Sequence, residues 1–242
     1  MPLVVRAHLA GGVAQGAPWG IALDGLLASA MWQETKASAI AAGQGYARAM
    51  EVDDPPDLDL PLARCRAGNG AWHWAATCLW PGAEAQTDAH VWMGKLDHRD
   101  LEHVADRLPK IISGRQGRFR GRRMPVLVTS TPQVTWRAVG DPDRIAELLE
   151  PVRSIGKKRG SGEGHVLSWE ISAAPELDPL AAGHLHPDGT LGRTTPKACV
   201  RRLEQAGCPP TVDGGTGLAG LRPPYMHPAR QTRLRLPALL DG

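Results

Sequence analysis

The chain has 242 residues, of which 42% are hydrophobic and 22% are charged, and its formal net charge is +3. This is enough apolar sequence for a substantial core, so the composition excludes an intrinsically disordered protein. The apolar runs fall short of the roughly 18 to 20 residues of a membrane span. The N-terminus has no signal-peptide pattern, so we expect a soluble, cytoplasmic protein without membrane contact.

The charge is unevenly distributed along the chain. Residues 1–104 carry 7 Lys+Arg against 12 Asp+Glu, whereas residues 105–242 carry 21 against 13. Such a split predicts one basic face that binds a polyanion and another face that does not. Nucleic acid is therefore the expected partner.

The N-terminal part predicts a strand, a helix and a second strand. Residues 3–9 are apolar and β-branched, and the strand ends at a Gly-Gly pair. Residues 21–42 have leucines at helical spacing, and residues 71–80 alternate as a strand does. Residues 53–61, acidic and proline-rich, should be an exposed connection.

The middle of the chain predicts two strands, a helix and a last strand. Residues 126–129 and 133–139 have strand character. Asp141 and Pro142 supply an N-cap and a first-turn proline for a helix that ends near residue 155. Residues 165–171 alternate again, which completes the β-α-β-β-α-β order of a ferredoxin-like α+β fold.

This order defines the expected domain organisation. Residues 1–174 form the ferredoxin-like domain, with a basic segment inserted at about 110–123. Residues 175–242 are rich in Pro and Gly and form a C-terminal extension packed on it. Within the extension we expect a short helix at 196–205 and a strand at 232–236.

A glycine-rich basic loop, GKKRGSGEG, spans residues 156–164. Its glycines let the backbone approach a ligand closely, and its consecutive cations suit phosphate. It is neither a Walker loop nor a dinucleotide fingerprint, because it leaves a helix and enters a strand. The alternative is a flexible solvated connection. The predicted RNA-binding residues are Gly156, Lys157, Lys158, Arg159, Gly160, Gly162 and Gly164.

A second basic segment, KIISGRQGRFRGRR, spans residues 110–123 and has neither helical nor strand periodicity. Arginine makes bidentate phosphate contacts and stacks on bases, and such segments often become ordered only on RNA. The alternative is a disordered basic loop without a specific ligand. Its candidate RNA-binding residues are Arg115, Arg118, Arg120, Arg122 and Arg123.

Cysteine spacing gives no metal signature. No CxxC pair occurs, so we expect ordinary reduced thiols, no metal and no cofactor. A His-x-His pair at His184 and His186 has no matching partner set in the sequence. The four cysteines are Cys65, Cys78, Cys199 and Cys208.

Two histidines are candidates for a catalytic general base. His73 on the second strand or His165 beside the glycine-rich loop could deprotonate a 2′-hydroxyl, since histidine titrates near neutral pH. Nothing in the spacing selects either one. We therefore assign no catalytic residue and expect a binding protein rather than an enzyme.

Three blocks of the chain resemble a known family. They are GIALDGLLA at 20–28, SIGKKRGSGEGHVLSWEI at 154–171 and RPPYMHPAR at 222–230. With a ferredoxin-like (RRM-like) order and a glycine-rich loop before the last strand, they resemble the RAMP superfamily of CRISPR–Cas systems. Their order looks like the 5′-handle-capping (Cas5-like) subunit of type IV effector complexes.

The resemblance implies a non-catalytic subunit of an antiviral defense ribonucleoprotein complex. Such a subunit holds the repeat-derived 5′ handle of the crRNA and contacts the backbone and large subunits. In relatives the arginine-rich insertion corresponds to a thumb-like protrusion. Contact with target DNA near the foot of the complex stays open.

Two alternative functions also stay open. One is a metal-independent endoribonuclease that processes CRISPR precursor RNA, because some relatives cleave RNA. The other is a protein–protein scaffold whose basic loops are solvated surface without RNA contact.

Overall fold

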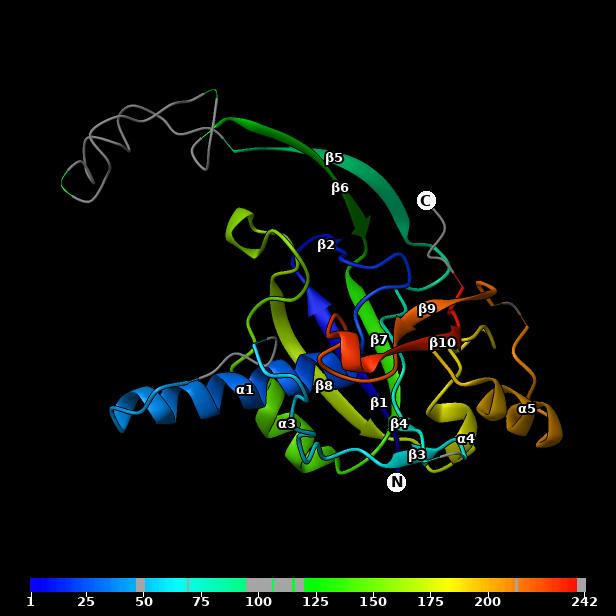
Figure 1. The fold of residues 1–242 in the computed structure, drawn as a ribbon. Helices are drawn as coiled ribbons and strands as arrows, with labels where there is room; N and C mark the ends of the chain where they lie inside the picture. Colours follow the sequence, from blue (N-terminus) through cyan, green and yellow to red (C-terminus); the bar gives the residue numbers. More distant parts are fainter. Residues whose placement is uncertain are drawn as a thin grey trace.

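The molecule is built around a three-stranded antiparallel sheet (Figure 1). Strand β1 (Pro2–Leu9) lies at its centre, between β7 (Gln133–Val139) and β8 (Val166–Ala173). The computed structural model describes residues 1–46, 51–68, 70–94, 106, 115, 120–211 and 213–238. The other elements in this part of the chain are β2 (Val13–Ala14), α1 (Leu23–Ala41), β3 (Arg64–Arg66), β4 (Trp72–Trp74), β5 (Gln86–Gly94), β6 (Arg122–Ser130), α3 (Pro142–Leu149), α4 (Pro179–Ala182), α5 (Lys197–Gln205), β9 (Thr216–Gly220), β10 (Gln231–Arg235) and the 3-10 turns η3 (Arg159–Ser161) and η4 (Pro228–Arg230).

The alternation along β1 places the core on one face of the central sheet. Leu3, Val5 and Ala7 are fully buried, whereas Arg6 and His8 point to the other face and pair with a carboxylate of β8. Helices α1 and α3 pack over the apolar face and contribute leucines to the same core. The expected strand at 3–9 is therefore confirmed.

Both expected helices form, although α3 ends at Leu149 and not near residue 155 as expected. The side chain of Asp141 accepts hydrogen bonds from the backbone N–H groups of Asp143 and Arg144, which caps α3. Only the first turns of α1 are buried, at Leu23 and Leu27 among others, and its second half projects past the sheet (Figure 1).

The strand expected over 71–80 is mostly irregular. Only Trp72–Trp74 is regular, as β4, and it pairs with β3. Further along, the segment meets β7 through isolated bridges at Ala76 and Trp80. The backbone of Ala75 and Thr77 bonds to β7, while the carbonyl oxygens of Trp74 and Ala76 accept hydrogen bonds from the buried Arg193 guanidinium. The described chain is thus a mixed α/β fold with several antiparallel sheets, and the four-stranded ferredoxin-like arrangement stays a prediction.

Strands β5 and β6 form a hairpin arm that reaches away from the central sheet (Figure 1). The expectation of no periodicity up to residue 123 is wrong at its end, because Arg122 and Arg123 are the first residues of β6. They pair with Gly94 and Met93 of β5. Because β5 and β6 are far apart in the sequence, no local pattern reveals that they pair. Strand β2 pairs with the other edge of β6.

The segment 175–242 is attached to helix α1 by a buried ion pair. Arg193 and Asp24 have side chains only 1% and 0% exposed, and their Nη2 and Oδ2 atoms are 3.7 Å apart. Tyr225 donates its hydroxyl to the same carboxylate, with O···O distances of 2.7 and 2.8 Å. This triad joins the first turn of α1 to two separate parts of the extension.

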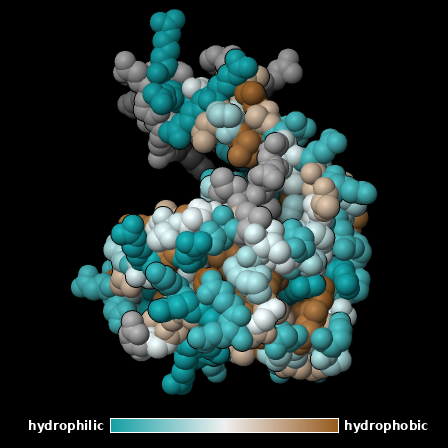
Figure 2. Space-filling model, turned by 90° about the vertical axis from the view of Figure 1, so that its right-hand side faces the viewer, coloured by the Kyte–Doolittle hydropathy of each residue, from teal (hydrophilic) through white to brown (hydrophobic). Residues whose placement is uncertain are grey.

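The described surface is largely hydrophilic. Figure 2 shows polar side chains over most of one face, with hydrophilic and hydrophobic residues side by side on the protruding upper part. The described residues include no helix with the length and apolarity needed to cross a bilayer. The expected short helix and strand of the extension are confirmed as α5 and β10.

Replacing Arg193 by leucine should strongly destabilise the fold. The substitution leaves Asp24 buried without its cation, which costs about 3–5 kcal/mol in comparable buried pairs. Tyr225→Phe removes only one hydrogen bond to the carboxylate and should cost about 1–3 kcal/mol. Urea unfolding followed by tryptophan fluorescence measures both changes. Arg144→Ala, which breaks an exposed pair with Glu147, is the control and should leave the midpoint unchanged. Equal midpoints for Arg193→Leu and the unmodified protein would contradict this role.

Candidate functional site

The glycine-rich loop is fixed at both ends by backbone hydrogen bonds. Ile155 donates its N–H to the carbonyl of Gly164 at 2.9 Å, and Gly164 donates to Gly12 at 2.8 Å. Lys157 donates to the carbonyl of Ala14 at 2.8 Å. The loop is therefore tied to the segment around β2, which itself pairs with the arm.

The four glycines of the loop have different roles. Gly156 and Gly164 have φ angles of 79° and 66°, and a Cβ there would collide with the carbonyl oxygens of Ala14 and Ile155. Gly162 also has a positive φ of 93° but faces open space, as Gly160 does. Two glycines are thus required for packing, and two leave the tip of the loop uncovered.

A tryptophan on the arm holds the tip of the loop. The Lys158 ammonium lies 3.2 Å from the centroid of the Trp92 ring, in a cation–π contact. Trp92 also donates its indole N–H to Ser161 Oγ at 3.2 Å. Next to it, His90 Nδ1 lies 3.7 Å from the carboxylate of Glu163. Lys158 itself has a left-handed backbone, with φ of 58°, which turns it toward the arm.

A cavity of about 280 Å³ opens beside this contact. Lys157 and Lys158 line one side of it, and Met124 and Val126 of β6 line another. Residues 15–18 close the third side. The cavity thus combines cations with apolar side chains.

The arm has two chemically different faces. Because side chains alternate along a strand, Arg122 lies on the same face as Trp92, toward the loop, and Arg123 lies on the opposite face. That opposite face carries exposed apolar residues, with Val91 49% and Met93 72% exposed.

The predicted RNA-binding residues are only partly brought together. The arm meets the loop at Lys158, and the exposed Lys157 and Arg159 flank that contact. Arg115 and Arg120 are exposed. Arg118 and Lys110 lie outside the described residues.

The two histidine candidates differ sharply in exposure. His73 is 0% exposed, and burial together with the Arg193 cation lowers its pKa to about 4. A general base must reach the hydroxyl that it deprotonates, so His73 does not fit that role. His165 is exposed at the end of the loop, where its backbone bridges to Ser154.

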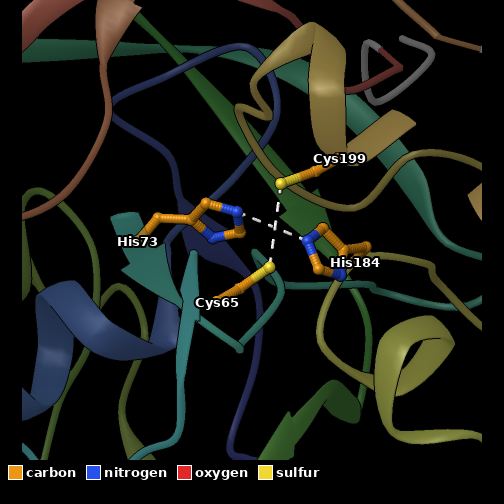
Figure 3. Close-up of side chains that lie close together, drawn as sticks. All are labelled: Cys65, His73, His184 and Cys199. Carbon is orange, nitrogen blue, oxygen red and sulfur yellow. Dashed lines mark hydrogen bonds between the residues drawn. The ribbon is translucent and has the colours of Figure 1, made fainter. Parts of the chain in front are cut away.

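The structure also assembles a cluster that the sequence pattern did not predict. The ligand atoms of its members all lie within 4.8 Å of one another (Figure 3). No spacing signal links them, because the two halves of the cluster lie more than a hundred residues apart in the sequence. His186 is outside the cluster, buried, and its Nδ1 has no partner among the described residues. The members are Cys65, His73, His184 and Cys199.

Trp92→Ala should loosen the tip of the loop. The substitution removes a cation–π contact and a hydrogen bond, together worth about 1–2 kcal/mol. Cleavage that requires local opening should then accelerate about 5- to 30-fold. Limited trypsin digestion with mass identification of cuts after Lys157, Lys158 and Arg159 measures it. Trp92→Phe keeps an aromatic ring, so its rate of loop cleavage should fall between those of the unmodified protein and Trp92→Ala. The rate of cleavage after the remote Arg233 should not change. Equal rates in all three proteins would show that Trp92 does not hold the loop.

A family model described as CRISPR type IV associated protein Csf3 matches residues 1–180. The matched part includes the loop, both strands of the arm, Cys65 and His73. Comparison with curated proteins gives no significant match.

Proposed function

The chain belongs to the Csf3 family of CRISPR type IV associated proteins, and on that premise we propose that it is the guide-RNA-binding subunit of a type IV CRISPR complex. In this proposal it holds the 5′ handle of the crRNA, as the 5′-handle-capping subunits of the RAMP superfamily do. The observation that carries the proposal is the cationic loop tip, anchored to the arm beside a cavity.

The loop tip has the chemistry for phosphate. Lys157, Lys158 and Arg159 are consecutive, no acidic side chain separates them, and two of them are exposed. Contact with Trp92 holds Lys158 in place before any ligand binds, which reduces the ordering cost of binding. A chain of phosphates crossing this tip would release counterions and gain affinity.

The neighbouring cavity has the chemistry for a base. At about 280 Å³ it lies just below the roughly 300 to 1,000 Å³ of ordinary ligand pockets, so it suits one splayed-out base. Met124 and Val126 offer apolar contact to the base, and Lys157 and Lys158 can reach its phosphate. A single-stranded handle is the form of RNA that presents bases in this way.

The opposite face of the arm suits a protein neighbour. Val91 and Met93 are 49% and 72% exposed and lie on the same face by strand register. Apolar side chains beside a charged rim are typical of protein–protein contacts. We assign this face to a backbone or large subunit of the complex.

The first test removes the cations of the loop. The triple variant Lys157→Ala, Lys158→Ala, Arg159→Ala should lose guide RNA from the co-purified complex. Its slope of log affinity against log salt should fall by about 2, since each single-strand phosphate contact contributes about 0.7. The control removes three exposed cations elsewhere, Lys36, Lys197 and Arg201, with the same change in net charge. Equal RNA retention in both triple variants would refute the site.

The second test uses two neighbouring arginines of β6 as a matched pair. Arg122→Ala should weaken RNA binding and lower the salt slope by about 0.7, because Arg122 shares the face of Trp92. Arg123→Ala removes the same charge from the opposite face and should leave RNA binding unchanged. Filter binding of labelled repeat RNA over a salt series measures both. A loss of RNA binding in Arg123→Ala but not in Arg122→Ala would indicate that the RNA binds the opposite face of the arm.

The third test addresses catalysis. As a binding subunit, the protein should leave labelled repeat RNA intact in buffer without added divalent cations. Gel analysis of the RNA after long incubation measures this. Cleavage that disappears in His165→Ala would instead identify a metal-independent endoribonuclease, because His165 is the exposed histidine beside the loop.

A further inference from the structure

We propose that Cys65, His73, His184 and Cys199 form a structural zinc site. The site is separate from the proposed RNA-binding surface. It would bind one Zn²⁺ through two thiolates and two imidazoles, with no open coordination position.

The spacing of like atoms in the cluster fits tetrahedral zinc. Cys65 Sγ and Cys199 Sγ are 3.7 Å apart, and the Nε2 atoms of His73 and His184 are 3.4 Å apart. A tetrahedral Zn²⁺ with Zn–S of about 2.3 Å and Zn–N of about 2.05 Å places two sulfurs about 3.8 Å and two nitrogens about 3.3 Å apart. The S–S and N–N lines cross in Figure 3, as opposite edges of a tetrahedron do. The largest separation is within 4.8 Å, so binding would draw the pairs together by at most about 1 Å.

The second nitrogen of each ring has the partner that a zinc-bound histidine needs. His73 Nδ1 lies 3.0 Å from the carbonyl oxygen of Trp74, and His184 Nδ1 lies 2.7 Å from that of Leu180. A carbonyl only accepts, so both Nδ1 atoms carry the proton. Zinc-binding histidines make this same contact, which fixes the tautomer and the orientation of the ring.

Two facing lone pairs are the strongest argument for a cation. With Nδ1 protonated in each neutral ring, the Nε2 atoms of His73 and His184 are both acceptors, yet they face each other at 3.4 Å. Two acceptors cannot hydrogen-bond to each other, and both rings are fully buried from water. A metal ion between them would bind both lone pairs at once.

The surroundings also suit a thiolate pair. Arg202 donates from Nη1 toward Cys65 Sγ at 3.6 Å, and hydrogen bonds of this kind orient the ligands of bound metal ions. Two thiolates neutralise the charge of Zn²⁺. Sulfur and imidazole ligands in a tetrahedral arrangement select zinc over Mg²⁺ or Ca²⁺, which take oxygen ligands. The site would join β3 and β4 to α5 and to the turn after α4.

The direct test is metal content and metal replacement in the full chain. Protein purified under reducing conditions without chelator should contain one Zn²⁺ per chain by elemental analysis. Replacement with Co²⁺ should give the visible absorption of a tetrahedral ion and a thiolate charge-transfer band. Free Zn²⁺ at a hundredfold its Kd should raise Tm by about 5 to 10 °C over the metal-free protein.

The cysteines that lie outside the cluster provide a matched control. Cys65→Ser with Cys199→Ser should lower zinc occupancy at least about tenfold at limiting zinc. Cys78→Ser with Cys208→Ser changes the same number of thiols outside the cluster and should leave the zinc occupancy unchanged. Zinc binding retained by both double variants would overturn the proposal. An unmodified protein that contains no zinc and shows no tetrahedral cobalt spectrum would overturn it as well.

A measurement on the unmodified protein covers the case in which the variant does not fold. Zinc should protect the partly exposed Cys65 from alkylation but not Cys208, which is also partly exposed and lies outside the cluster. Equal labelling with and without zinc would overturn the site. A Cys65–Cys199 disulfide in freshly purified protein, detected by peptide mapping, would overturn it as well. Neither readout depends on RNA.

Discussion

The buried ion pair of Arg193 and Asp24 organises the molecule. Removing two charges from water costs several kcal/mol per ion, so such a pair stabilises only when every donor and acceptor is used. Here the guanidinium also donates to carbonyl oxygens of Trp74, Ala76 and Leu221. One side chain therefore joins the first helix, the irregular segment beside β7 and the C-terminal extension. The extension has its own apolar clusters, and this polar contact joins it to the main core.

The cysteine–histidine cluster depends on the same arrangement. Arg193 lies in the sequence between His184 and Cys199, and its guanidinium bonds to the carbonyl of Trp74, the residue after His73. The ion pair thus positions the segments that supply three of the four proposed zinc ligands. A zinc ion would add a further link between the matched part of the chain and residues beyond 180, through chemistry independent of the proposed RNA-binding surface.

The proposed RNA-binding surface depends on a second long-range contact, between Lys158 and Trp92. A lone glycine-rich loop is free to move, and ordering it would reduce affinity for a ligand. The arm removes part of that cost by holding the loop tip, and strand alternation separates the face that carries Trp92 from the exposed apolar face. In the proposed function one face of the hairpin would contact RNA and the other a protein neighbour.

The sequence by itself predicted the features whose causes are local. The alternation of residues 3–9, the Asp141–Pro142 cap and the strand after the glycine-rich loop need only neighbouring residues, and each is confirmed in β1, α3 and β8. The family resemblance also rested on contiguous blocks, and the match over residues 1–180 confirms its type IV CRISPR part. The basic character of the loop follows from composition alone, although its ligand stays a prediction.

Only the tertiary structure decided the features that depend on distant partners. Arg193 bonds to carbonyl oxygens of the segment expected as a strand at 71–80, and the exposed Asp57 of the 53–61 connection pairs with Arg222 and Arg230. Arg122 and Arg123 are strand residues because β5 pairs with them. The cluster of cysteines and histidines combines two pairs with no common spacing. The sequence shows the chemistry of each side chain. Which distant side chains contact one another depends on packing, and no periodicity in the sequence reveals those contacts.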